Sequence, residues 1–398
     1  MKKRIIVLFI GIVFLFSFPN LIHAGKTRGL TDQTITIGSI MDLTGPASFI
    51  MRGTSAGAES YVKYINDQGG INGRKIRYIV EDNTYQPATA VAALKKLVYR
   101  DKIFALCLSG GTVCVLAMAD AVKRDDVPTM CYSGSEAVYT PFRRHLFSAQ
   151  TSNERYGIGV AEYIIKELKP KSPRFASIYQ DDEFGKSGLR GFRKAAKFYG
   201  VEWVGEKPYK RGALDFTSQV ISLKNAGANY VYLSSLIREG SGILREAKKL
   251  NWHPIFSGFS GMSLGKLFEL AGDSADGFIG SRDVAGWEED TPGVRKIKGT
   301  IMKYRGNLEG MHSHTNIGWE LTMLMTEGLK RAGKGLTTDN LIRALESIKN
   351  FDPDGLAAPV TWGRNRREGA IGLKLMKADV ANKAFVPITG WIMPELKK

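Results

Sequence analysis

The sequence has few of the residues on which metal centres and enzyme active sites are usually built. It contains 5 histidines and 3 cysteines among 398 residues. His312 and His314 are two positions apart, a spacing that helical geometry does not bring to one face, so pocket or surface imidazoles are favoured over a zinc pair. The run Gly258-Phe259-Ser260-Gly261-Met262 fails a Gly-x-Ser-x-Gly motif at its last position, and no set of histidine, acid and nucleophile is legible. We therefore predict neither a metal site nor an enzyme.

A phosphate-binding loop is also missing. Gly185-Lys186-Ser187 has the ending of such a loop, but Gln180 stands where the motif needs its first glycine. The preceding run 181–183 is entirely acidic and would repel a phosphate group. No cofactor is expected.

Acidic residues are outnumbered, with 39 Asp and Glu against 56 Lys and Arg, and the formal charge is +17. The basic residues are spread along the chain with acids between them, as in the run 162–171, and no basic run is interleaved with aromatic residues. A nucleic-acid partner is therefore not predicted. The positive field instead favours anionic solutes or a membrane partner.

Long apolar runs are confined to the N-terminus. A basic start, Lys2-Lys3-Arg4, precedes an apolar core at 5–18 and the cleavage pattern Ile22-His23-Ala24. A membrane anchor is the alternative, but the apolar run is shorter than the ~20 residues of a spanning helix. We predict a signal peptide at 1–24, cleaved after Ala24. Its removal takes away three of the 56 basic residues and no acid, so the formal charge falls from +17 to +14.

An exported chain with three cysteines leaves at least one of them unpaired. Cys107 and Cys131 end predicted strands, and Cys114 lies at a predicted helix start. The sequence does not decide whether Cys107 pairs with Cys114 or with Cys131, and buried free thiols are the preferred interpretation.

The chain alternates between strand-like and helix-like segments. Predicted strands lie at 35–40, 75–80, 102–108, 127–132, 175–180, 201–206, 230–234 and 254–257, and predicted helices at 56–66, 112–123, 187–199 and 240–250. Such alternation is typical of α/β proteins with parallel sheets covered by helices on both faces. The mature length exceeds that of one ordinary core, so two domains are expected.

Two small polar loops follow neighbouring predicted strands. Ser109-Gly110-Gly111-Thr112 ends one strand and opens a helix, and Tyr132-Ser133-Gly134-Ser135 follows the next strand. Hydroxyl groups and a helix N-terminus favour a negatively charged group, although an N-cap with a glycine turn would look the same. Because ligands bind at the carboxyl ends of strands in open α/β sheets, we predict that these two loops hold a carboxylate.

The order of short motifs between 35 and 83 resembles a known family. Leu43-Thr44-Gly45-Pro46, the run Gly69-Gly70-Ile71-Asn72-Gly73 and Glu81-Asp82-Asn83 resemble the opening of the periplasmic Leu/Ile/Val-type binding proteins. These are the type I solute receptors of ABC importers. The resemblance implies two Rossmann-like lobes joined by a three-strand hinge, which close on a small ligand and deliver it to an ABC permease. It implies a monomer in the periplasm, and an extracytoplasmic sensor of the same fold is the alternative.

The resemblance also places the three passages between the lobes, at 147–152, 277–283 and 357–361. Lobe one then combines 25–150 with 282–358, and lobe two combines 151–281 with 359–398. The strand-like runs 372–376 and 385–388 would complete lobe two.

Ligand-binding residues follow from the resemblance by position. In lobe one, Ser109, Ser133 and Ser135 match residues that hold the ligand carboxylate and amino group, and Phe49 or Arg52 borders the side-chain pocket. In lobe two, Phe184 matches an aromatic cover over the ligand, and Leu236 stands where an aromatic residue is usual.

Ser260 marks a departure from the resemblance. Relatives that bind amino acids carry an acid at about this position to pair with the ligand ammonium, and an unpaired buried ion is costly. Glu239, Glu136 or Asp182 are the candidate substitutes. We therefore expect an organic acid or amide-like solute without an α-amino group, rather than a branched-chain amino acid.

Overall fold

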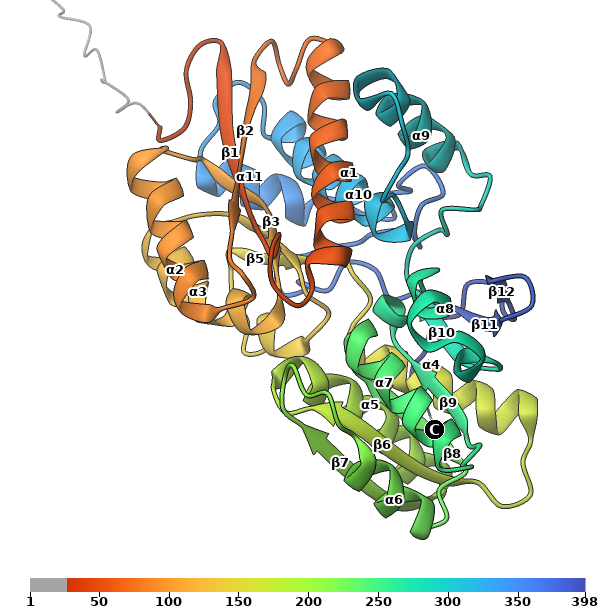
Figure 1. Cartoon of the computed structure of the whole chain (residues 1–398). Coiled ribbons are helices and arrows are strands. Elements are labelled where there is room, and N and C mark those ends of the chain that lie inside the picture. Colours follow the sequence, from red (N-terminus) through yellow and green to blue (C-terminus); the bar gives the residue numbers. More distant parts are fainter. Residues whose placement is uncertain (1–26, 398) are drawn as a thin grey trace, which may run out of the picture.

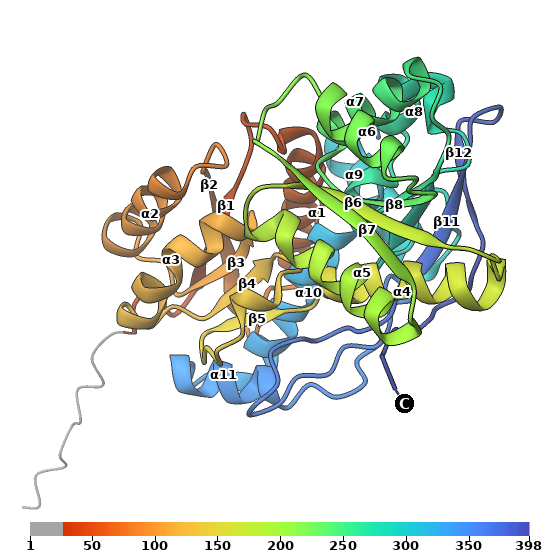
Figure 2. The same cartoon turned by 90° about the horizontal axis from the view of Figure 1, so that it is seen from below.

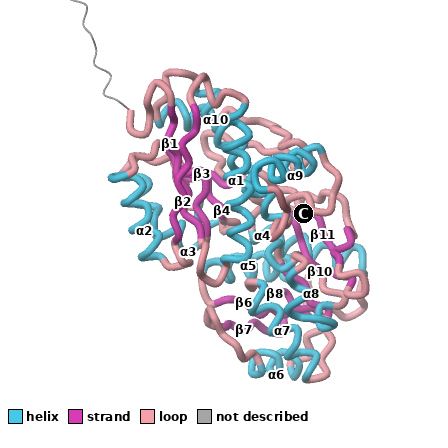
Figure 3. The backbone as a smooth tube through the Cα atoms, turned by 45° about the horizontal axis from the view of Figure 1, so that its top comes forward, coloured by secondary structure: helices cyan, strands magenta, loops and turns pink. Residues whose placement is uncertain are grey.

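The computed structural model describes residues 27–397, so the predicted signal peptide at 1–24 lies outside the described residues. The chain forms two bodies, each with its own sheet and helices (Figure 1). Figure 3 shows the strands gathered in two separate groups. We call the body around the first sheet lobe one and the other lobe two. None of the helices within 27–397 is both long and apolar enough to cross a membrane.

The sheet of lobe one is five-stranded and parallel, in the order β2-β1-β3-β4-β5. Its strands are β1 Thr34–Met41, β2 Lys75–Asp82, β3 Ala105–Gly110, β4 Thr129–Tyr132 and β5 Leu146–Ser148. All strands except the edge strand β2 carry buried side chains on both faces, as β3 shows with every residue buried. This pattern is that of a parallel sheet covered by helices on both sides.

Helices cover both faces of this sheet, with α2 and α3 on one side and α1 and α10 on the other. Two close contacts between α1 and α10 depend on glycine. A Cβ on Gly57 would lie 2.0 Å from the main-chain oxygen of Thr315, and one on Gly318 would lie 1.8 Å from that of Thr54. The helices of lobe one are α1 Ser48–Asp67, α2 Pro87–Lys95 with its extension η1 Lys96–Arg100, α3 Thr112–Arg124, the turn η2 Glu136–Val138, α9 Pro292–Arg305, α10 Ser313–Ala332 and α11 Thr338–Glu346.

The sheet of lobe two has seven strands in the order β12-β11-β10-β9-β8-β6-β7. These are β6 Arg174–Gln180, β7 Glu202–Tyr209, β8 Tyr230–Ser234, β9 Ile255–Gly258, β10 Ile279–Arg282, β11 Lys374–Asp379 and β12 Ala384–Pro387. The first five are parallel, as predicted, whereas β11 and β12 add an antiparallel hairpin at the outer edge (Figure 2).

The helices of lobe two also lie on two faces, because successive residues of its strands alternate in direction. Phe175 of β6 packs with α4 and α5, and the next residue, Ala176, faces the side of α6 and α7. The helices are α4 Asn153–Tyr163 with its extension η3 Ile164–Leu168, α5 Glu183–Tyr199, α6 Thr217–Asn225, α7 Ile237–Lys249, η4 Ser260–Met262, α8 Lys266–Ala271 and η5 Gly272–Ala275.

Three segments connect the lobes, between β5 and α4, between β10 and α9, and between α11 and β11. Several contacts near 370 suggest a third passage later than the predicted 357–361. Gly369 N still bonds to Ser148 O at 2.7 Å, and Ala370 N to Ala149 O at 3.1 Å, on the side of lobe one. Trp362 is buried there and donates from Nε1 to Ser148 O at 2.9 Å. We propose that the lobe boundary at this passage lies near 370.

Most predicted elements occur with shifts of a few residues, and the largest difference is α1. The helix was predicted from 56, whereas α1 begins at Ser48. Its first turns already bury Ile50 and Met51, but the small and polar residues at 53–55 obscure the helical spacing. Cys107, Cys114 and Cys131 are all buried and free, which confirms the preferred interpretation.

Candidate functional site

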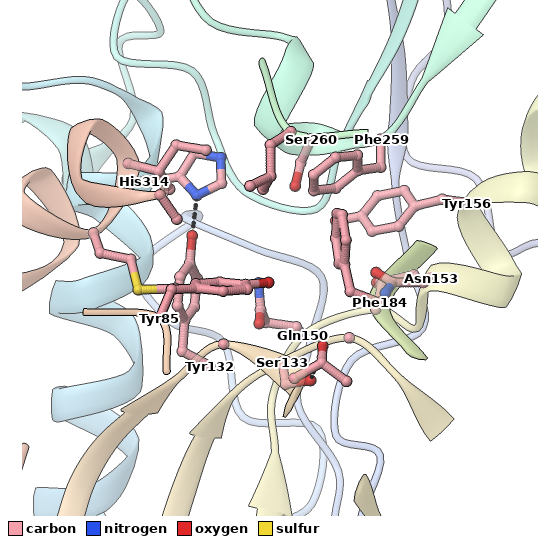
Figure 4. Close-up of a pocket in the computed structure, with 18 residues that line it drawn as sticks. Tyr85, Tyr132, Ser133, Gln150, Asn153, Tyr156, Phe184, Phe259, Ser260 and His314 are labelled. Carbon is pink, nitrogen blue, oxygen red and sulfur yellow. Dashed lines mark hydrogen bonds between the residues drawn. The ribbon is translucent and has the colours of Figure 1, made fainter. Parts of the chain in front are cut away.

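A cavity of about 60 Å³ lies between the two lobes, where loops at the carboxyl ends of both sheets meet (Figure 4). Lobe one contributes Ala47, Ile50, Met51, Tyr85, Gly111, Thr112, Tyr132, Ser133, Gly134 and His314. The first hinge segment contributes Gln150 and Thr151, and lobe two contributes Asn153, Tyr156, Phe184, Leu236, Phe259 and Ser260. Segments that are far apart in the sequence therefore share one enclosed space.

Six of the residues predicted from sequence border this cavity: Thr112, Ser133, Gly134, Phe184, Leu236 and Ser260. Four others do not, and each has a structural reason. Ser109 and Gly110 are still part of β3, so their side-chain positions are buried in the sheet. Ser135 instead donates to Glu183 Oε1 at 2.8 Å, across the boundary between the lobes. Phe49 is 38% exposed and stacks on His312 with 5.1 Å between ring centres, outside the cavity.

The polar side of the cavity is built on the start of α3. Gly111, the residue before this helix, has φ 87°, a left-handed conformation that glycine adopts without strain. A Cβ at this position would also lie 3.1 Å from the Tyr85 ring. No side chain of the described chain caps the first turn of α3. The Thr112 hydroxyl is 2.9 Å from the Ser133 hydroxyl. These two hydroxyls therefore lie beside the N–H groups of the first turn of α3, which have no partners within the helix.

His314 at the start of α10 lines the same side of the cavity. Its Nδ1 is hydrogen-bonded to the Tyr132 hydroxyl (Figure 4). Burial lowers the pKa of His314 to about 3, so the ring is neutral. Its Nε2 is buried without a partner among the described residues. His312 is instead the N-cap of α10, because its Nδ1 accepts from His314 N at 3.2 Å. Within 27–397 no cluster of three His, Cys, Asp or Glu residues suits a metal.

Tyr85 reaches the cavity from an unusual turn after β2. Thr84 and Tyr85 have φ values of 49° and 56°, which are uncommon for residues other than glycine. Two carboxamide or carboxylate groups hold this turn. Asp82 Oδ1 accepts from Thr84 N at 2.8 Å, and Asn83 Oδ1 accepts from Tyr85 N at 2.8 Å. Asn83 Nδ2 also donates to Gly110 O at 2.9 Å, which ties the turn to β3.

Lobe two supplies a mainly apolar wall. The rings of Phe184 and Phe259 meet edge to face, with centres 4.9 Å apart and an angle of 70° (Figure 4). Leu236 continues this wall, and all three residues border the cavity. Phe184 is positioned by α5, whose first turn is capped by Asp182 through Gly185 N at 3.2 Å.

Among the described residues, no carboxylate side chain borders the cavity. The three acids considered as substitutes at Ser260 are engaged elsewhere. Glu136 accepts from Glu154 N at 3.2 Å, and burial raises its pKa to about 7. Asp182 pairs with Arg211 at 2.9 Å, and Glu239 accepts from Gly212 N at 3.2 Å. Asp283 in the second hinge segment is buried, which raises its pKa to about 6, but it does not line the cavity either.

Several lining residues were not predicted from the sequence. Gln150 lies within the predicted first hinge passage at 147–152 and Asn153 directly follows it, so a search of that passage for polar residues could have found them. Tyr85 follows the Glu-Asp-Asn motif by two positions, but its left-handed turn has no sequence signal. His314 and Tyr156 come from helices whose approach to the cavity depends on how the lobes pack.

Comparison with known proteins gives consistent results. A family model described as "Periplasmic binding protein" matches residues 34–384. The chain is 28% identical over 328 residues to Leu/Ile/Val-binding protein homolog 3 of Brucella melitensis biotype 1, covering 80% of this chain and 84% of that protein. It is 25% identical over 335 residues to the Leu/Ile/Val-binding protein of Escherichia coli strain K12, covering 83% and 87%. Among solved structures, a branched chain amino acid ABC transporter from Thermus thermophilus with bound valine has a TM-score of 0.84 and 26% identity, covering 92% of this chain and 98% of that one.

Proposed function

Because the chain belongs to the periplasmic binding protein family, we propose that it captures a small carboxylate-bearing solute between its lobes and delivers it to an ABC permease. The family consists of solute-binding proteins, not of enzymes, and its place is the periplasm. Lobe closure around a bound solute is the family mechanism, for which periplasmic binding proteins are an established example.

The observation that carries the carboxylate proposal is the uncapped start of α3 at the cavity wall. The first turn of a helix has N–H groups without helical partners, and the helix dipole adds partial positive charge there. Gly111 and Thr112 bring this turn to the cavity, and Ser133 adds a hydroxyl beside it. A carboxylate would satisfy these donors, as anions do at other helix N-termini.

The class of carboxylate is a second part of the proposal. The names of the two sequence relatives refer to leucine, isoleucine and valine, and the Thermus protein holds valine, which favours solutes of that size. An α-ammonium group would need a compensating acid in this enclosed space. Ser260 and the other lining residues supply none. We therefore propose an amino acid or organic acid, with preference for an acid or amide-like solute that lacks the α-amino group.

The test begins with native mass spectrometry of the solute that copurifies with the protein. A thermal-shift screen then pairs leucine, isoleucine and valine with the corresponding acids that lack the amino group. Stabilisation by the desamino acids is expected. Stabilisation by the amino acids alone would overturn the preference but keep the carboxylate proposal, and stabilisation by neither set, with no carboxylate in the mass spectrum, would overturn both.

Closure and export have tests of their own. Small-angle scattering with and without the identified solute should show a more compact bound form, and identical profiles at saturation would contradict closure.

N-terminal sequencing of periplasmic protein should begin at Gly25 if cleavage follows Ala24. Delivery requires that the loaded protein stimulate the ATPase activity of a partner ABC transporter, and no stimulation by any candidate transporter would argue against delivery.

A further inference from the structure

Arg211 connects the two lobes at the edge of the cavity. It follows β7 in lobe two, and Tyr85 follows β2 in lobe one, 126 positions earlier. Arg211 Nη1 donates to the main-chain oxygen of Tyr85 at 2.9 Å. The guanidinium carbon also lies 4.5 Å from the centre of the Tyr85 ring. One side chain of lobe two therefore holds both the backbone and the ring of a cavity residue of lobe one.

The lobe-one half of this contact is rigid. Tyr85 is only 2% exposed, and its left-handed turn is held by Asp82 and Asn83 as described above. The turn leaves the Tyr85 carbonyl free to accept from lobe two. Uncommon backbone conformations that several hydrogen bonds maintain are often found at functional positions.

The lobe-two half is tied to the cavity wall as well. Arg211 Nη2 bonds to Asp182 Oδ2 at 2.9 Å. Asp182 is the residue that caps α5, the helix that carries Phe184. Gln180 Nε2 donates to the same Asp182 oxygen at 2.6 Å. Arg211 is thus fixed to the element that places the aromatic cover over the cavity.

We propose that Arg211 is a positioning residue for closure, which holds the lobes together over a bound solute by clasping Tyr85. It acts through Tyr85 and Asp182, since it does not itself border the cavity. Its role in solute capture rests on the proposed function, whereas its effect on the balance of open and closed forms does not.

The contacts of Arg211 differ in the conformations in which they can form. Arg211 and Asp182 belong to the same lobe, so their ion pair persists when the lobes separate, whereas the two contacts with Tyr85 exist only in the closed form. The guanidinium gains a carbonyl acceptor and an aromatic face on closure, both of which stabilise a cation. Its Nε is buried without a partner in the described chain, which offsets part of this gain. The balance should favour closure and slow the release of solute.

The test measures the distance between the lobes in protein without added solute. Lys123→Cys in α3 and Asn225→Cys in α6 introduce two exposed thiols, one on each lobe, for spin labels. The native cysteines are all buried, which leaves the two new thiols as the reactive ones. Double electron–electron resonance then gives the populations of the closed and the open form in each variant.

Arg211→Ala is expected to lower the ratio of closed to open protein by about tenfold, the effect of losing a charge-assisted hydrogen bond of ordinary strength. Arg193→Ala is the matched control, because Arg193 pairs with Glu206 at 2.9 Å on the surface of lobe two, and this variant should match the parent. Equal distance distributions for Arg211→Ala and the parent would overturn the proposal.

Arg211→Lys provides a second variant that retains the charge beside Asp182. A lysine cannot present a planar group to the Tyr85 ring while donating to two acceptors in fixed directions. Its closed population should lie between those of the parent and Arg211→Ala. A closed population equal to that of the parent would show that a positive charge alone is enough to favour closure. It would overturn the proposed role of the guanidinium contacts with Tyr85. Because no solute is added, a wrong solute class would leave these results unchanged.

Discussion

The two lobes share one architecture but offer different chemistry to the cavity between them. Lobe one presents the uncapped start of α3, the Thr112 and Ser133 hydroxyls and the neutral ring of His314. Lobe two presents mainly rings and an aliphatic side chain, with Phe184, Phe259 and Leu236 at the wall. Lobe one adds apolar side chains as well, at Ala47, Ile50 and Met51, but its polar groups have directions fixed by α3 and β4, whereas the lobe-two wall is mainly aromatic and aliphatic.

This difference suggests a division of labour between the lobes. Hydrogen-bond donors on rigid elements can hold the polar end of a solute before the lobes close, because their directions are set by α3 and β4. Apolar contacts with lobe two form only when the lobes meet and water leaves the cavity. We therefore expect changes in lobe one to alter the affinity itself and changes in lobe two to alter mainly the rate of release.

The largest effect is expected from Ser133→Ala, which removes a hydroxyl from the polar side. Loss of a hydrogen bond to a charged group costs ~1.5–3 kcal/mol. This corresponds to roughly a tenfold to hundredfold weaker affinity. Calorimetry with the solute identified by mass spectrometry measures the change. Unchanged affinity would contradict the assignment of the polar anchor to lobe one.

Acidification is expected to lower the free energy of unfolding by about 2 kcal/mol through His314 of lobe one. Burial lowers the pKa of His314 to about 3 from an ordinary value of 6.5. On acidification, the unfolded chain binds a proton at this residue below 6.5, whereas the folded protein does not until near 3. The stability that neutral His314 contributes is therefore complete above pH 6.5 and is lost as the pH falls.

Urea unfolding at about pH 7.5 and about pH 5 tests this expectation. His314→Gln should lose about 2 kcal/mol less stability between the two pH values than the parent does. His253→Gln is the matched control, because His253 is an exposed histidine of lobe two. The same acid sensitivity in His314→Gln and the parent would show that the buried imidazole is not responsible.

A smaller effect is expected from Phe184→Leu in lobe two. The substitution keeps an apolar side chain but loses the edge-to-face contact with Phe259, worth ~0.5–1.5 kcal/mol. Stopped-flow kinetics should show faster dissociation of the solute, with association almost unchanged. A change confined to association would contradict the division of labour between the lobes.

The smallest effect is expected from Ser109→Ala. The Ser109 Oγ is buried and has no hydrogen-bond partner in the part of the chain that the structure describes. Removing an unsatisfied hydroxyl should leave affinity within about twofold and stability unchanged or up to ~1 kcal/mol higher. A tenfold loss of affinity would indicate that Ser109 contributes to solute binding, as Ser133 is expected to do.

The serines illustrate how far prediction from sequence could go. Two polar loops were predicted after the strands that correspond to β3 and β4, because strand ends and glycine turns have local signals, but the first was predicted to begin at Ser109, which belongs to β3. Which serine of each loop faces the cavity depends on where the strand stops. β3 continues to Gly110 and takes Ser109 into the sheet, whereas β4 ends at Tyr132 and leaves Ser133 at the cavity. A difference of one residue reverses the direction of a side chain in a strand.

Local pattern determined the α/β fold class, since alternating strands and helices have distinct periodicities. The resemblance to the binding-protein family implied the two lobes and the missing acid at Ser260. Tertiary structure alone decided the contacts that join the lobes. The clasp of Arg211 on Tyr85 links residues 126 positions apart, and the bond from Ser135 to Glu183 links residues 48 positions apart. Neither pair has a local signal, because each contact exists only after two separately folded sheets have been brought together by the hinge.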